Sequence, residues 1–233
     1  EKTKEKPIIY SDFVSNPSWG AVNNSHYFSS YWGKENIIKQ ADGSIKVLYP
    51  KGSYKPSAKP RGGAGFIYNM QEGYEELTFS YDITFAENFN FVKGGKLPGL
   101  CGGDCPRGGT NSDNGFSVRF AWKTDGFLDT YSVFPGSSKY GDFGNKNAFQ
   151  FESGNTYTIK QKIKLNTPGE QNGLLEVYVN DKQVSQNSYM LYRNSQDITI
   201  NSLFFNTFFG GSDASWATPD DTEIIFNNLK IEQ

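Results

Sequence analysis

Several features that define large classes of protein are missing from this sequence. No stretch approaches the roughly 18 consecutive apolar residues of a membrane span, so we expect no membrane partner. No window of about 12 residues shows the spacing of an amphipathic helix, and there is no internal repeat. The first residues, EKTKEK, lack the apolar region of a signal peptide, which is typical of a mature or trimmed chain.

Histidine and cysteine are scarce. His26 is the single histidine, and Cys101 and Cys105 lie in one glycine-rich loop. These three residues cannot complete a four-ligand zinc site, whereas a local disulfide is geometrically feasible. We favour the disulfide, which predicts a secreted, extracellular protein, and Asn23-Asn24-Ser25 is the one usable glycosylation sequon.

Net charge is also low. The chain has 23 Lys and Arg against 25 Asp and Glu, for a net charge of −2, and this balance disfavours nucleic acid as a partner. Residues 45–71, however, carry five basic residues and no acid, while residues 212–223 carry four acids and no base. A local basic zone suits an anionic ligand, although solvated loop lysines would give the same pattern.

What is abundant is aromatic residues and glycine. Aromatics make up 16% of the 233 residues, and 25 glycines and 10 prolines are spread along the chain without a period. Alternating apolar residues predict half-buried strands at 75–85, 116–122, 157–165, 174–179, 198–209 and 223–231. We therefore expect an all-β fold, one domain over residues 1–233 built as an antiparallel two-sheet jelly roll with a concave groove.

Residues 91–134 differ from the rest because they combine cations with a strongly alternating strand. Phe116, Val118, Phe120 and Trp122 should point into the core, and Ser117, Arg119, Ala121 and Lys123 to the other face. A three-residue loop at 124–126, with Gly126 in the left-handed conformation, would place Arg119 opposite Tyr131 and Ser117 opposite Val133. Lys96, on the preceding glycine-flanked strand, adds a second cation beside the phenol.

Two cations beside a phenol suit β-elimination in a uronic-acid polymer. The proton that is removed lies next to a carboxylate and becomes acidic enough only when cations neutralise that carboxylate. A tyrosine whose pKa is lowered by adjacent cations could serve as base and then as acid. No metal or organic cofactor is required. A glycoside hydrolase would need two carboxylates facing the groove, and we expect none from residues 91–134.

Several ordered motifs resemble those of polysaccharide lyase family 14 and, next to it, those of the related glucuronan lyases of family 20. They are Gly95-Lys-Leu-Pro-Gly99, Gly115-Phe-Ser-Val-Arg-Phe-Ala-Trp122 with a tyrosine twelve residues after the arginine, Phe208-Phe-Gly-Gly-Ser-Asp213 and Ser215-Trp-Ala-Thr-Pro-Asp220. The resemblance implies a jelly roll that cleaves alginate or glucuronan. Lys96 matches the family's catalytic lysine, Ser117 and Arg119 its Ser-x-Arg pair, and Tyr131 its first tyrosine.

The sequence departs from this pattern at one place. The family's alginate lyases have a second tyrosine two residues after the first, where this chain has Val133, and the change bears on alginate specificity and activity. Tyr140 or His26 could compensate for the missing phenol, and both are candidates for substrate binding together with Arg61 and Lys123.

Three further features have more than one interpretation. Phe204, Phe205, Phe208 and Phe209 could stack on sugar, but alternation favours the core for most of them. We expect Trp216 to be buried under the sheet edge rather than to stack on carbohydrate. Acidic residues could hold a structural Ca²⁺, namely Asp213, Asp220, Asp221 and Glu223.

Two functional hypotheses remain. The first is a secreted, monomeric polysaccharide lyase that acts on an anionic polysaccharide and leaves 4,5-unsaturated uronate ends, with Lys96 and Arg119 on the carboxylate, Tyr131 as base and acid, and Ser117 holding the substrate or Tyr131. The second is a non-catalytic carbohydrate-binding jelly roll that recognises the same kind of polymer.

Overall fold

The computed structural model describes residues 28–144 and 147–233, which form a sandwich of two seven-stranded antiparallel sheets. In spatial order the first sheet contains β1 (Phe28–Trp32), β4 (Ala64–Tyr74), β13 (Ile200–Phe209), β6 (Gly94–Gly103), β7 (Gly115–Lys123), β8 (Leu128–Val133) and β9 (Asp142–Phe143). The second contains β12 (Lys182–Met190), β11 (Gly173–Val179), β10 (Thr156–Lys164), β5 (Glu76–Phe85), β14 (Thr222–Glu232), β3 (Ile45–Tyr49) and β2 (Ile37–Lys39).

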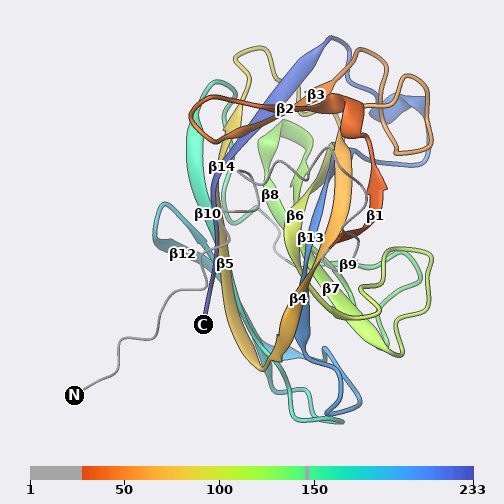
Figure 1. Cartoon of the computed structure of the whole chain (residues 1–233), viewed down its shortest axis with the longest axis vertical. Coiled ribbons are helices and arrows are strands. Elements are labelled where there is room, and N and C mark those ends of the chain that lie inside the picture. Colours follow the sequence, from red (N-terminus) through yellow and green to blue (C-terminus); the bar gives the residue numbers. More distant parts are fainter. Residues whose placement is uncertain (1–27, 145–146) are drawn as a thin grey trace.

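The two sheets face each other across one core (Figure 1), as the predicted jelly roll requires. The helical elements of the described chain are single 3-10 turns, η2 (Lys34–Asn36), η3 (Thr124–Gly126) and η4 (Ala214–Trp216). None of these described turns has the length and apolar character needed to cross a membrane.

All six predicted strands are present, and their observed ends differ from the predicted ones by at most two residues. The alternating run in β5 has its apolar side chains fully buried, as predicted, at Leu77, Phe79, Tyr81, Ile83 and Phe85. Asn180 and Asp181 form the turn between β11 and β12, and both residues have positive φ. Alternation therefore located six strands, but it did not reveal β3, which also has one buried face.

The core consists largely of aromatic rings that meet between the sheets. Phe205 of β13 lies 5.2 Å from Phe226 of β14, and Phe120 of β7 lies 6.3 Å from Tyr81 of β5, both edge-on. Because edge-on rings pack at such distances with favourable quadrupole contacts, these pairs join the two sheets. β14, the strand predicted near the end of the sequence, lies inside the second sheet between β5 and β3.

We expect Phe226→Ala to lower the free energy of unfolding by about 3–5 kcal/mol, because it empties a fully buried ring site between the sheets. Ile225→Ala, on the other face of the same strand and only partly buried, is the matched control and should cost much less. Chemical denaturation of both variants measures the difference, and equal losses would contradict this packing.

Candidate active site

The outer face of the first sheet gathers the residues that the sequence singled out. In the β7–β8 hairpin Arg119 pairs with Tyr131 and Ser117 with Val133, as predicted, and Gly126 has a φ of 81° in the loop. On the other side of β7, Lys96 of β6 pairs with Ala121. The inward side chains of β7 are all fully buried in the core, so the alternate ones point to the outer face.

Arg119 is held between two aromatic rings. Its guanidinium carbon lies 4.5 Å from the ring centre of Phe204 and 5.0 Å from that of Tyr131, and Nη1 donates to Asn206 Oδ1 at 3.2 Å. The side chain is only 3% exposed, and its Nε finds no hydrogen-bond partner among the described residues. Burial lowers the pKa of Arg119 to about 10, so the group remains a cation at neutral pH with a donor to spare.

Lys96 lies beside the same phenol. Its Nζ is 4.1 Å from the ring centre of Tyr131 and 4.9 Å from that of Phe143. Burial, followed by the nearby charges of Arg119 and Lys123, lowers the pKa of Lys96 to about 7. Near neutral pH a substantial fraction of this amine is therefore uncharged and can accept a proton.

Tyr131 is fixed by its hydroxyl and by its ring. The hydroxyl donates to the carbonyl of Tyr140 and also hydrogen-bonds the backbone of Gly108. A side chain at Gly108 would overlap that hydroxyl. The expectation that cations lower the pKa of this phenol is wrong in its net effect: burial raises the pKa of Tyr131 more than Arg119 lowers it.

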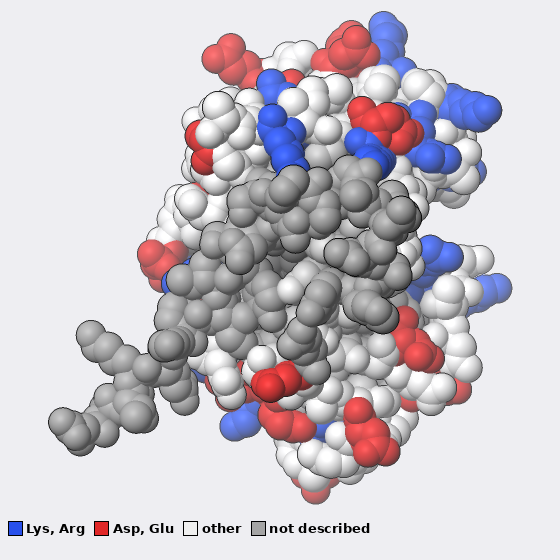
Figure 2. Space-filling view, viewed as in Figure 1, with Lys and Arg blue, Asp and Glu red and all other residues white. Residues whose placement is uncertain are grey.

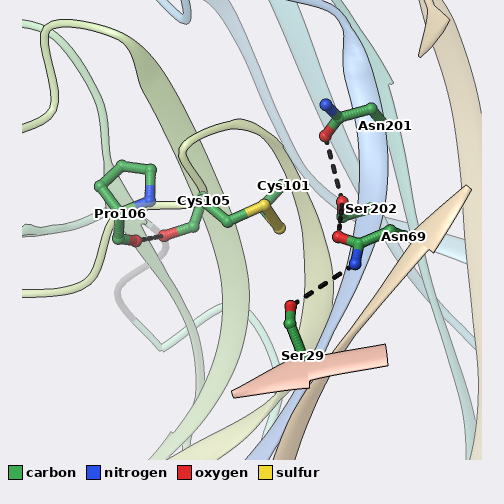
Figure 3. The surroundings of a disulfide bond; sticks show 8 residues. Ser29, Asn69, Cys101, Cys105, Pro106, Asn201 and Ser202 are labelled. Carbon is green, nitrogen blue, oxygen red and sulfur yellow. Dashed lines mark hydrogen bonds between the residues drawn. A yellow bond between two sulfur atoms is a disulfide. The ribbon is translucent and has the colours of Figure 1, made fainter. Parts of the chain in front are cut away.

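Ser117 has a different role from the predicted one. It is fully buried, and its Oγ donates to the carbonyl of Pro106 at 2.6 Å, so its hydroxyl does not face a substrate or Tyr131. The predicted disulfide between Cys101 and Cys105 is formed directly before Pro106 (Figure 3). Together the disulfide and Ser117 hold the loop that carries Gly108 against the Tyr131 hydroxyl.

The four residues predicted to bind substrate differ in where they lie relative to the cluster of Lys96, Arg119 and Tyr131. Lys123 belongs to the cluster, with Nζ 3.7 Å from the ring centre of Phe143. Tyr140 contributes its carbonyl to Tyr131, while its ring is 68% exposed. Arg61 donates to the Pro56 carbonyl and lies 3.7 Å from Glu35, so its observed contacts are outside the cluster. His26 lies outside the described residues, as does the sequon at 23–25.

Sequence reasoning missed a carboxylate on this face. Asp129 is two residues before Tyr131 on β8, pairs with Ala121 and is 4% exposed. Its charge opposes the lowering of the Lys96 pKa. The expectation that residues 91–134 add no acid to this face was therefore wrong, and the alternation that placed Tyr131 would also have placed Asp129.

Two residues of β13 were missed as well. Phe204 and Asn206 lie beside Arg119 because β13 is the neighbour of β6 in the sheet, an adjacency that no sequence pattern reveals. Of the four phenylalanines of this strand, Phe205 and Phe209 enter the core between the sheets, which is two of the four where most were expected. Phe204 packs instead against the disulfide, and Phe208 meets Trp32 at 5.9 Å.

A polar and aromatic pocket of about 340 Å³ lies on the same sheet. Its lining includes Trp32, Ile67, Phe204 and Asn206 from the strands and Arg107 from the disulfide loop. Since Phe204 and Asn206 also contact Arg119, this pocket is adjacent to the cationic cluster.

The basic and acidic segments turn out to pair with each other. Lys46 lies 2.6 Å from Glu223, Lys51 lies 3.8 Å from Asp220, and the Lys51 N–H donates to Asp221. Figure 2 shows Lys and Arg gathered mainly on the upper and right-hand parts of the face in view, with Asp and Glu among them and at the lower end. Two of the five basic residues of 45–71 therefore pair with the acidic segment, while Arg61 lies beside Glu35 instead.

Three of the four acidic residues expected to hold a structural Ca²⁺ take part in these contacts with Lys46 and Lys51. In residues 28–144 and 147–233, no group of three or more His, Cys, Asp or Glu side chains is placed to hold a metal ion. Asp213 instead accepts hydrogen bonds from Ser212 and Ser215, which lower its pKa to about 2. Nearby, Trp216 is partly buried against Gly211, with Lys93 Nζ 6.0 Å from its ring centre.

Known proteins of one family share this fold and sequence pattern. Residues 38–229 match the family described as Polysaccharide lyase 14. An alginate lyase of that family from the marine Aplysia kurodai is 28% identical, with a TM-score of 0.81 over 90% of this chain and 92% of its own. The alginate lyase vAL-1 from a Chlorella virus shares the fold at 22% identity, with a TM-score of 0.79 over 93% of this chain and 96% of its own.

Two other relatives are more distant or partial. An endo-β-1,4-glucuronan lyase from the fungus Trichoderma reesei shares the fold at 11% identity, with a TM-score of 0.58 over 90% of this chain and 88% of its own. A protein of Paramecium bursaria Chlorella virus 1 called exolysin is 34% identical over 76 residues, which are 32% of this chain. The chain spans only 12% of the length of that curated relative.

The lowered pKa of Lys96 predicts a pH-dependent contribution to stability. Between pH 7 and 10.5 the unfolded chain keeps a proton that folded Lys96 has released, so this group makes the fold more stable as pH rises through that interval. The unfolding free energy of the wild type relative to Lys96→Met should increase from pH 7 to pH 10. Lys164→Met, on the second sheet, controls for the loss of one positive charge, and a difference that stays flat with pH would contradict the shift.

Proposed function

Because this chain belongs to polysaccharide lyase family 14 and is a polysaccharide lyase, we propose that it cleaves an alginate-type polyuronate by β-elimination, leaving 4,5-unsaturated uronate ends. The observation that carries the proposal is the buried Arg119, placed beside Lys96 and Tyr131, whose Nε has no hydrogen-bond partner in residues 28–144 and 147–233. The similarity to the alginate lyase of Aplysia kurodai supports the choice of substrate class.

Arg119 is the group we assign to the substrate carboxylate. It is a permanent cation at the pH of the reaction, and a buried guanidinium without a carboxylate partner is electrostatically costly. A bound uronate would supply that partner. It would also bring its own acidic carbon next to a cation that stabilises the enolate-like charge formed when the proton leaves.

Lys96 is the group we assign as the base. Its pKa of about 7 makes the neutral amine available near neutral pH, which is where a general base works best. Tyr131 fits this role less well, because its raised pKa keeps the phenol protonated. We therefore divide between two residues the roles first given to Tyr131 alone.

Tyr131 then serves as the acid. Lys96 takes the proton from the carbon that carries the carboxylate, the carbon–oxygen bond of the neighbouring glycosidic link breaks, and a carbon–carbon double bond forms in the sugar. The Tyr131 phenol gives its proton to the departing oxygen. Lys96 then holds the extra proton 4.1 Å from the phenolate ring, and its return to Tyr131 restores both groups.

We also propose that the enzyme acts outside the cell. The disulfide supports this, because such bonds persist in oxidising compartments.

Glucuronan remains a second candidate polymer, since a glucuronan lyase shares the fold. The expected monomer stays a prediction, which size-exclusion chromatography with light scattering tests.

Incubation with polymannuronate, polyguluronate and glucuronan tests the activity, with the ultraviolet absorbance of the unsaturated product as the readout. We expect a rise with at least one alginate polymer. Tyr131→Phe and Lys96→Arg should each lower kcat by about 10²–10⁴-fold, because each removes one proton-transfer group, while polymer binding is largely kept. Tyr189→Phe, an exposed tyrosine on β12, is the control. Binding of polymer by the wild type with no absorbance change would favour the non-catalytic carbohydrate-binding alternative.

The pH profile tests the division of roles. If neutral Lys96 is the base, kcat/KM should rise with pH through about 7 as the amine loses its proton. It should fall only at alkaline pH, as Arg119 loses its charge near pH 10 and Tyr131 ionises above the ordinary tyrosine value. If Lys96→Arg keeps some activity and its kcat/KM still rises with pH over the same range, the base is another group.

A further inference from the structure

Lys96 and Arg119 share a face of the first sheet because β6 contains one extra residue. Lys96 pairs with Ala121 and Gly99 pairs with Arg119, so β6 advances three residues while β7 advances two. The register shifts between Leu97 and Gly99, and the additional residue is Pro98. This is a β-bulge, in which two residues of one strand oppose one of the other.

The bulge decides where the Lys96 amine points. Successive side chains of a strand alternate between faces, so residues three apart point in opposite directions in a regular strand. Lys96 and Gly99 are three apart, yet their partners on β7 both belong to the outer face. Without the extra residue, Lys96 would point into the aromatic core whenever Gly99 paired with Arg119.

Two buried polar side chains of the second sheet reach across the core to this bulge. Tyr81 of β5 donates from its hydroxyl to the Pro98 carbonyl at 3.2 Å. Gln161 of β10, with its amide oriented to fit its neighbours, accepts from Leu100 N at 2.7 Å and donates to Val118 O at 3.2 Å. Both side chains are fully buried, and together they bind the carbonyl of the extra residue, the N–H two residues after it and a carbonyl of β7.

These polar groups need an explanation beyond packing. A buried amide or hydroxyl costs free energy unless it is hydrogen-bonded. An apolar residue of the same size would fill this core without that desolvation cost. The partners of Tyr81 and Gln161 are backbone atoms of β6 and β7 at and next to the bulge. Their bonds therefore fix the local register of the two strands that carry Lys96 and Arg119.

We propose that Tyr81 and Gln161 are positioning residues for catalysis, which hold the Pro98 bulge and thereby set the Lys96 amine against Arg119 and Tyr131. The proposal rests on the function proposed above, because it gives Lys96 the role of base. Neither residue touches the outer face. They act through the backbone, and a small displacement of a catalytic group is enough to reduce turnover strongly.

The test compares Tyr81→Phe and Gln161→Met with Tyr192→Phe. Tyr192 is also fully buried and also donates to a backbone carbonyl, that of Leu174 at 3.1 Å, but its contacts do not include the bulge. All three variants are assayed on polymannuronate, polyguluronate and glucuronan, well below the midpoint of thermal unfolding of each. We expect kcat to fall by about ten-fold or more in the first two, with KM nearly unchanged, and to stay near wild type in Tyr192→Phe.

A second readout separates this proposal from the proposed function. The pKa of Lys96, followed by NMR of lysine-labelled protein, should move from about 7 toward the ordinary lysine value in Tyr81→Phe and Gln161→Met only. If the wild type is inactive, the lyase assignment is overturned. If the pKa of Lys96 nevertheless shifts in Tyr81→Phe and Gln161→Met, the positioning role is supported. If Tyr81→Phe folds and has the same kcat and the same Lys96 pKa as the wild type, the positioning role is overturned. This holds even if Gln161→Met does not fold.

Discussion

An arginine that is buried without a carboxylate partner in the described part of the chain is the constraint on which this site depends. Arg119 lies between the rings of Phe204 and Tyr131, and among the described residues its hydrogen-bond partner is a neutral amide, that of Asn206. Such an arrangement is stable only because aromatic faces attract cations and the rest of the sandwich holds the sheet in place. It leaves a positive charge that an anionic sugar can neutralise, and the chemistry of the site follows from that.

Burial also moves apart the pKa values of the two groups that we propose to transfer protons. It lowers the pKa of the Lys96 amine and raises that of the Tyr131 phenol, because in each case it disfavours the charged form. One group is thereby ready to take a proton and the other to give one at the same pH. Pairs of titratable groups whose environments move their pKa values toward such complementary roles are typical of acid–base catalysis.

The loops outside the sheet complete this environment. The disulfide and the Ser117–Pro106 bond hold one loop, and Gly109 of that loop donates to the carbonyl of Lys139 in the next. Between them they enclose the Tyr131 hydroxyl. Ser117, which the sequence suggested as a substrate contact, thus contributes to the site by fixing its walls.

Much of the fold follows from local patterns. Alternation revealed six strands, although not β3, which also has one buried face. The loop at 124–126 placed Arg119 opposite Tyr131, because hairpin register depends on turn type and loop length. The edge strand β12 was not predicted, since most of its residues are polar and exposed and give no alternating signal. β6 was recognised only in part, because its glycines and its bulge interrupt the period.

The sequence by itself determined the fold class, the disulfide, the hairpin register and the three side chains that we propose as catalytic, because these depend on short-range alternation and on motifs that lie within a few residues. Only the tertiary structure decided that β13 brings Phe204 and Asn206 to Arg119, that the basic and acidic segments form ion pairs with each other, and that Tyr131 is a stronger candidate for acid than for base. The physical reason is that strand adjacency and desolvation arise from contacts between residues far apart in the chain, and no local pattern records them.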